Sequence, residues 1–280
     1  HDTEREYPQM SDWKAGDIVA NGIRIHYHRT GGPKPPVVLL HGITDNGLCW
    51  TRLVRALEAD YDCIMVDARG HGLSDAPAEG YGPDDHAADV AGLIAALDLG
   101  RPVLIGHSMG ASTAAHTAAG YPDSVGAVVL EDPPWFAEPP VPPDPEAALA
   151  EWRAGIAANK AKSVEELIAL CREQSPTWDE VEWLPWAESK RQVDPRVVGF
   201  AGRWARPWQE VARRIACPAL LVTADPERGA IVRPEVAREA AALMRDCRVV
   251  HIPGAGHNIR REQFELFLKA VTGFLREVAG

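Results

Sequence analysis

The sequence predicts an α/β protein with a doubly wound, mostly parallel sheet and a helical cap inserted after the sixth strand. Short runs rich in valine, isoleucine and leucine alternate with longer helical segments along most of the chain. Several of these runs are apolar throughout, as in parallel strands that are covered on both faces. The alternation stops near residue 133 and resumes near residue 217.

Seven segments are predicted to be strands: 23–29, 36–40, 62–66, 102–106, 126–130, 218–223 and 247–252. Amphipathic segments lie between them. Val90, Leu93, Ile94 and Leu97 are spaced i, i+3, i+4 and i+7, so they form one apolar stripe on a helix. This alternation of strands and helices is typical of a doubly wound sheet.

The interruption begins with a proline-rich stretch. Residues 133–143, PPWFAEPPVPP, contain six prolines, which exclude a regular helix and a central strand. Leu149, Trp152 and Ile156 then form one helical stripe. Residues 163–166, SVEE, form a capping box, which predicts the start of another helix.

We therefore predict a core domain made of residues 12–132 and 212–280 and a cap made of residues 133–211. Seven of the nine tryptophans fall in the cap segment, and large aromatic side chains supply much of the binding area in apolar pockets. We expect three of them to contact a substrate: Trp135, Trp183 and Trp186.

Composition excludes several classes of protein. A net charge of −11 disfavours nucleic acid and anionic membranes as partners, because both require a positive surface. The polar segment HDTEREYPQM resembles neither a signal peptide nor a membrane span. The five cysteines are scattered and form no C-x-x-C pair, and no histidine pair has H-E-x-x-H spacing. We expect a cytoplasmic protein without a disulfide framework, metal or cofactor.

The sequence GHSMG at residues 106–110 fits the G-x-S-x-G pattern of a nucleophile elbow, with Ser108 at its centre. This chemistry needs an exposed serine on a tight strand-to-helix turn, flanked by small residues that let the helix approach the strand. The context fits, because the apolar run RPVLI precedes it and an alanine-rich run follows.

A nucleophilic serine also needs a base and an oxyanion site. Residues 39–46, LLHGITDN, follow a buried strand, so we predict the backbone N–H groups of Ile43 and Met109 as oxyanion donors. His257 lies in a glycine-rich loop after the last strand, which matches the chain order serine, acid, histidine. We predict that it is the general base, and that His41 braces the turn.

Together these motifs resemble the α/β-hydrolase superfamily, in its capped group of esterases, lactonases, haloperoxidase-like enzymes and dehalogenases. The resemblance rests on LLHG (39–42), VDARGHGLSD (66–75), GHSMG (106–110), YPDSVGAVVLED (121–132) and IPGAGHN (252–258). Haloalkane dehalogenases and epoxide hydrolases have aspartate at the elbow, so Ser108 disfavours those activities. Arg69 and His71 correspond to residues that usually brace a loop.

The resemblance allows the acid to follow either the sixth or the seventh strand. Asp132 lies 24 residues beyond Ser108, a spacing similar to that in haloalkane dehalogenases and zearalenone lactonases, and the latter share a similar run around the elbow. After the seventh strand, Ala224 and Glu227 replace the glycine and aspartate of the usual G-x-x-D pattern. Asp225 is also in reach. We rank Asp132 first, Asp225 second and Glu227 third.

The resemblance implies a serine hydrolase that cleaves a carboxylic ester or lactone with an apolar or aromatic moiety through an acyl-enzyme. The same triad also supports hydrolysis of a C–C bond, or perhydrolysis of the haloperoxidase type. A receptor that binds a small ligand without turning it over is a further alternative.

Overall fold

The structure, a computed structural model, describes residues 13–200 and 207–278. Its strands are β1 (Lys14–Ala20), β2 (Ile23–Arg29), β3 (Pro36–Leu40), β4 (Asp62–Val66), β5 (Val103–His107), β6 (Ala127–Glu131), β7 (Ala219–Thr223) and β8 (Cys247–His251). They form one sheet in the order β1-β2-β4-β3-β5-β6-β7-β8. The pairings β1–β2 and β2–β4 are antiparallel, whereas the pairings from β4 to β8 are parallel. The predicted fold class is confirmed.

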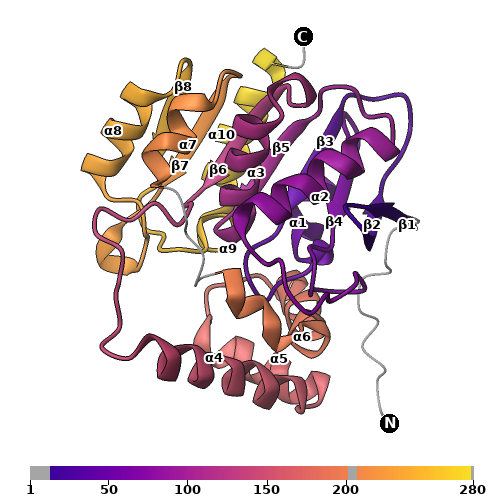
Figure 1. Ribbon diagram of the computed structural model, residues 1–280, viewed down its shortest axis with the longest axis vertical. Coiled ribbons are helices and arrows are strands. Elements are labelled where there is room, and N and C mark those ends of the chain that lie inside the picture. The colour runs from indigo at the N-terminus through magenta and orange to yellow at the C-terminus, as the bar shows by residue number, and fades with distance from the viewer. Residues whose placement is uncertain (1–12, 201–206, 279–280) are drawn as a thin grey trace.

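Helices cover both faces of the sheet (Figure 1). They are α1 (Thr51–Leu57), α2 (Pro83–Ala96), α3 (Met109–Gly120), α7 (Trp208–Arg214), α8 (Pro234–Leu243), α9 (Ile259–Glu262) and α10 (Phe264–Val278). One apolar cluster joins α2, α3, α7 and α8 to the sheet, and a second joins α1, α9 and α10 to it. Val38 and Leu40 of β3 belong to the first cluster, whereas Val37 and Leu39 belong to the second. Alternate side chains of one strand therefore supply both cores.

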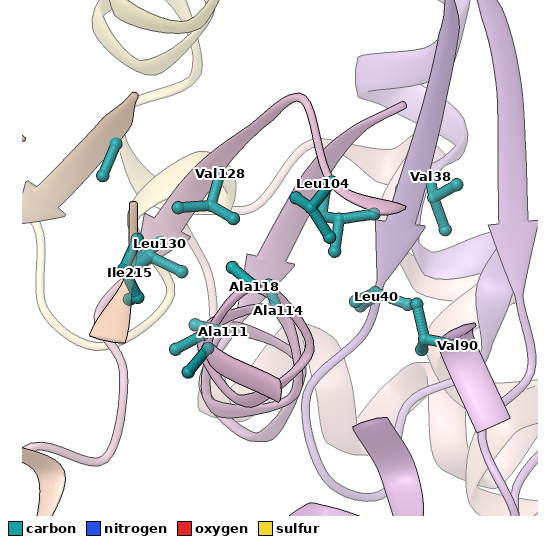
Figure 2. Packing of buried hydrophobic residues seen from close by; sticks show 14 of the residues in the cluster. Val38, Leu40, Val90, Leu104, Ala111, Ala114, Ala118, Val128, Leu130 and Ile215 are labelled. Atoms are coloured by element: carbon teal, nitrogen blue, oxygen red, sulfur yellow. The ribbon is translucent and has the colours of Figure 1, made fainter. Parts of the chain in front are cut away.

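The central helix α3 packs on the sheet through small side chains. Figure 2 shows Ala111, Ala114 and Ala118 of α3 beside the strand residues Leu104 and Val128. All five are buried. Alanine lets this helix lie close to the strands, so the start of α3 is held firmly at the end of β5.

The helices between β6 and α7 form a layer of their own at the carboxyl ends of the strands (Figure 1). They are α4 (Pro145–Lys160), α5 (Val164–Gln174) and α6 (Trp183–Gln192). Ser163 and Glu166 form the predicted capping box at the start of α5, with Ser163 accepting from Glu166 N at 3.1 Å. The proline-rich residues 133–143 contain no helix or strand. We call the whole segment between β6 and α7 the cap.

Helix α7 differs from the sequence prediction, which placed residues up to 211 in the cap. Its residues Val211 and Ala212 belong to the apolar cluster of the sheet, and α7 packs against α3. Trp208 at its start stacks on Trp135, with ring centroids 5.2 Å apart, and its Nε1 donates to the carbonyl of Phe136. The two ends of the cap segment therefore meet against the core.

Candidate active site

Ser108 lies at the junction of β5 and α3 with φ 51° and ψ −114°, a conformation that L-residues rarely adopt. Two close backbone approaches explain the flanking glycines. A Cβ at Gly110 would lie 1.9 Å from Leu40 O, and a Cβ at Gly106 would lie 2.2 Å from Gly110 O. Ser108 N donates to Glu131 O on the neighbouring strand at 2.9 Å. The turn therefore has the geometry of a nucleophile elbow.

Ser108 opens onto a cavity of about 410 Å³ between the sheet and the cap. His257 lines the same cavity, as do side chains from α4 and α6 of the cap. The cavity wall consists of Gly42, Ile43, Thr44, Asp45, His107, Ser108, Trp152, Gly155, Ile156, Asn159, Trp178, Trp186, Lys190, Val193, His257, Asn258 and Arg261.

Asp132 lies beside His257. Its Oδ2 is 2.6 Å from His257 Nδ1, and its side chain is fully buried. The backbone N–H groups of Ile231 and Val232 also donate to this carboxylate, at 2.9–3.1 Å. The two backbone N–H groups and His257 therefore fix the position of the Asp132 carboxylate.

The rival acids have other surroundings. Asp225 Oδ1 lies 3.0 Å from His251 Nε2, and its Oδ2 accepts from Gly254 N at 2.7 Å. These contacts tie the end of β7 to β8 and its following turn. Glu227 lies in the short helix Pro226–Arg228 with its side chain exposed. The structure thus brings Asp132, and neither of the other two, to His257.

The two predicted oxyanion donors come from the loop after β3 and from the start of α3. Ile43 belongs to the cavity wall, and Met109 is the first residue of α3. The loop that carries Ile43 is braced by two buried histidines: Ala68 N donates to His41 Nε2, and Thr44 N donates to His71 Nε2. Burial lowers the pKa of both histidines, so they stay neutral and can accept these bonds.

The tryptophans that line the cavity are not the three that were predicted to contact a substrate. Trp186 does line the cavity, but Trp135 is 2% exposed and packs in the sheet's apolar cluster against Trp208. Trp183 instead contacts the guanidinium of Arg172, 4.8 Å from its ring. Trp152 and Trp178 line the cavity in addition to Trp186. Trp152 shares its helical stripe with Ile156, which also lines the cavity. This stripe was therefore the sequence signal that could have identified Trp152 as a cavity residue.

Sequence reasoning missed the charged part of the wall. Lys190 and Arg261 line the cavity together with Asp45, and all three side chains are at least nine-tenths buried. Lys190 Nζ is 2.9 Å from Asp45 Oδ1, and Arg261 Nη1 is 3.1 Å from Asp45 Oδ2. Burial alone would raise the pKa of Asp45, but the charges of Arg261 and Lys190 hold it well below its usual value.

Residues 35–260 match the family model of the alpha/beta hydrolase fold. The chain is an α/β hydrolase. It is 32% identical to 2-(acetamidomethylene)succinate hydrolase of Mesorhizobium japonicum, over 88% of this chain and 90% of that protein. It is 31% identical to N-formylmaleamate deformylase of Pseudomonas putida, over 95% of this chain and 98% of that protein. The crystal structure of E-2-(acetamidomethylene)succinate hydrolase is similar, with a TM-score of 0.79 and 28% identity over 94% of this chain and 99% of that one.

Two further findings concern the part of this α/β hydrolase that the structure describes. No helix in residues 13–200 and 207–278 is long and apolar enough to cross a membrane. In the same ranges, no group of three or more His, Cys, Asp and Glu side chains could hold a metal ion.

Proposed function

We propose that this α/β hydrolase transfers an acyl group to water in two steps, with Ser108 as the nucleophile. One observation carries the proposal: the buried Asp132 is 2.6 Å from Nδ1 of His257, and His257 lines the same cavity as Ser108 on its strained turn. A nucleophile, a base and a group that orients the base are the parts that such a transfer needs.

In the first step, Nε2 of His257 accepts the proton of Ser108 Oγ as this oxygen attacks the substrate carbonyl. Asp132 accepts a hydrogen bond from Nδ1–H of His257, which fixes the tautomer and stabilises the imidazolium. The N–H groups of Ile43 and Met109 are proposed to stabilise the oxyanion, at about 10²–10³ in rate for each donor. His257 then protonates the leaving group, and in the second step it activates the water that releases the acid.

A carboxylic ester or lactone is the first candidate substrate, because an alcohol leaves readily from such an intermediate. The cavity volume of about 410 Å³ suits a small molecule. Trp152, Trp178 and Trp186 offer it an apolar surface.

An N-acyl amide of a small carboxylic acid is the second candidate. Two relatives that match nearly full length have names that describe an acylated nitrogen on a molecule bearing carboxylate: acetamidomethylene succinate and formylmaleamate. The wall of this cavity carries Arg261 and the amides of Asn159 and Asn258, which suit a carboxylate.

The test begins with Ser108→Ala and p-nitrophenyl acetate. We expect turnover to fall to background while the circular dichroism spectrum stays unchanged, and undiminished turnover would exclude Ser108 as the nucleophile. A fluorophosphonate probe should label the native chain at Ser108, and failure to label it would favour a receptor that binds without turnover.

The substrate class is tested with matched compounds. Esters and lactones of graded acyl size are compared with N-formyl and N-acetyl amides, each with and without a free carboxylate. Faster turnover of the amides that carry a carboxylate would favour the second candidate. Turnover restricted to a dienoate-like diketone, or to perhydrolysis, would replace both with the alternative reactions of the same triad.

A further inference from the structure

The cap holds the loop that carries Ile43 by direct hydrogen bonds. Lys190 of α6 donates to the carbonyl of Thr44 at 2.9 Å and to its Oγ1 at 3.0 Å. The N–H of Thr44 donates to His71 Nε2 at 3.2 Å. Every hydrogen-bonding group of Thr44 therefore has a partner, and the Lys190 ammonium supplies two of them.

Thr44 needs this support because of its backbone. Its φ is 68°, in the left-handed region that costs a β-branched residue free energy. The conformation of Thr44 fixes the direction of the peptide groups on either side of it. The Ile43 N–H shares its peptide plane with the Gly42 carbonyl, which accepts from Asp45 N at 3.1 Å. Asp45 directly follows Thr44, so the direction of the Ile43 N–H depends on how this turn is held.

Asp45 extends the connection to the histidine loop. Its Oδ1 accepts from Lys190 at 2.9 Å, while its Oδ2 lies 3.1 Å from Arg261 and 3.6 Å from Arg260. Both arginines belong to α9, which begins two residues after His257. One buried carboxylate thus links the cap, the loop of Ile43 and the helix that follows the proposed base.

The other ends of this network are also paired. Arg260 bonds to Glu131 through both its backbone N–H and its guanidinium, and Arg261 Nε donates to Glu182 at 3.0 Å. Together with the Lys190–Asp45 pair, the cluster contains three basic and three acidic side chains. Such a buried network has a defined geometry because each charge must keep its partners.

We propose that Lys190 is a positioning residue of the active site, which acts through Thr44 and Asp45 to hold the Ile43 N–H in its oxyanion-binding direction. This rests on the proposed function, since it assumes that Ile43 stabilises an oxyanion. The cap then contributes to the chemical step as well as to substrate binding.

The experiment compares Lys190→Met, which removes the ammonium and keeps an unbranched chain, with Lys160→Met as a matched control. Lys160 is a cap lysine of α4 whose Nζ donates to the carbonyl of Val193 at 3.3 Å. With p-nitrophenyl acetate we expect kcat of Lys190→Met to fall about 10-fold or more, up to the 10²–10³ that losing an oxyanion donor costs, with KM changed less than 3-fold. A trifluoromethyl ketone, which mimics the tetrahedral intermediate, should lose affinity by a similar factor. Lys160→Met should retain both values.

Hydrogen exchange supplies a readout that does not need activity. The amides of residues 42–46 should exchange faster in Lys190→Met than in the native chain. In Lys160→Met their exchange rates should be unchanged. If Lys190→Met fails to fold, Thr44→Val removes only the Oγ1 contact, and we expect it to lower kcat about 3-fold. Unchanged kcat and unchanged exchange in the folded variants would overturn the inference. An active Ser108→Ala would instead overturn the proposed function, and the exchange result would still report whether Lys190 holds the loop.

Discussion

Replacing Asp132 by asparagine should remove most of the activity while preserving the fold. Asp132 Oδ1 accepts from the N–H groups of Ile231 and Val232, and Oδ2 faces His257 Nδ1 at 2.6 Å. In Asp132→Asn the amide oxygen can keep the two backbone donors, which leaves the NH₂ group facing His257. Two donors cannot face each other, so Nδ1 must become the acceptor and the proton moves to Nε2. His257 then cannot accept the proton of Ser108.

The expected loss is about 10⁴-fold in kcat, as in serine proteases that have the same change, or about 5.5 kcal/mol of transition-state stabilisation. Asp225→Asn is the matched control. It weakens a contact with His251, whose side chain is 49% exposed, so we expect a loss of at most about 1 kcal/mol in the free energy of unfolding and a change in kcat below 2-fold. Both variants are assayed with p-nitrophenyl acetate, and their unfolding is followed with denaturant. A greater loss in Asp225→Asn than in Asp132→Asn would refute the reasoning.

Two further predictions concern the tryptophans of the cap and core and the stability of the fold in acid. Trp152→Ala should raise KM about 10-fold with little effect on stability, because this side chain lines the cavity. Trp135→Ala should lower the free energy of unfolding by about 3–5 kcal/mol and leave KM unchanged, because Trp135 packs in the core, and the opposite pattern in steady-state kinetics and urea denaturation would contradict this placement. The second prediction is loss of stability in acid. Burial, with a contribution from the charge of Arg69, lowers the pKa of His86 to about 3, so the unfolded chain takes up this proton first as the pH falls below about 6.5. His86→Leu should therefore reduce the slope of unfolding free energy against pH by about 1.4 kcal/mol per pH unit between pH 6 and pH 4, and an unchanged slope would show that His86 is protonated in the fold.

Most strands were predictable because the central parallel strands, from β4 to β7 in the sheet order, are buried on both faces and consist largely of apolar runs. Strand β1 lacks that signal. Its sequence KAGDIVA is mostly exposed, and it lies at the sheet edge paired only with β2. Its extended conformation depends on pairing with β2, so the local pattern of apolar residues could not predict it.

The acid could be ranked but not chosen from the sequence, because Asp132 and Asp225 follow adjacent parallel strands, β6 and β7. The choice depends on the direction of each side chain. Asp132 has φ 41° and turns toward His257, whereas Asp225 turns toward β8. The pairing of Lys190 with Asp45 could not be predicted from the sequence, since 145 residues separate them and no motif assigns a role to either side chain.

The stacked pair of Trp135 and Trp208 has a consequence for how such a protein can change. Because the two rings stack with their centroids 5.2 Å apart, the exit and the return of the cap segment lie side by side, and the insertion forms a closed loop on the sheet domain. The entropy of closing a flexible loop grows only with the logarithm of its length, at about 0.6 kcal/mol for each doubling. The intervening segment can therefore lengthen, shorten or be exchanged at little cost to the sheet. New specificities can arise there while the nucleophile, base and acid stay where the strands place them.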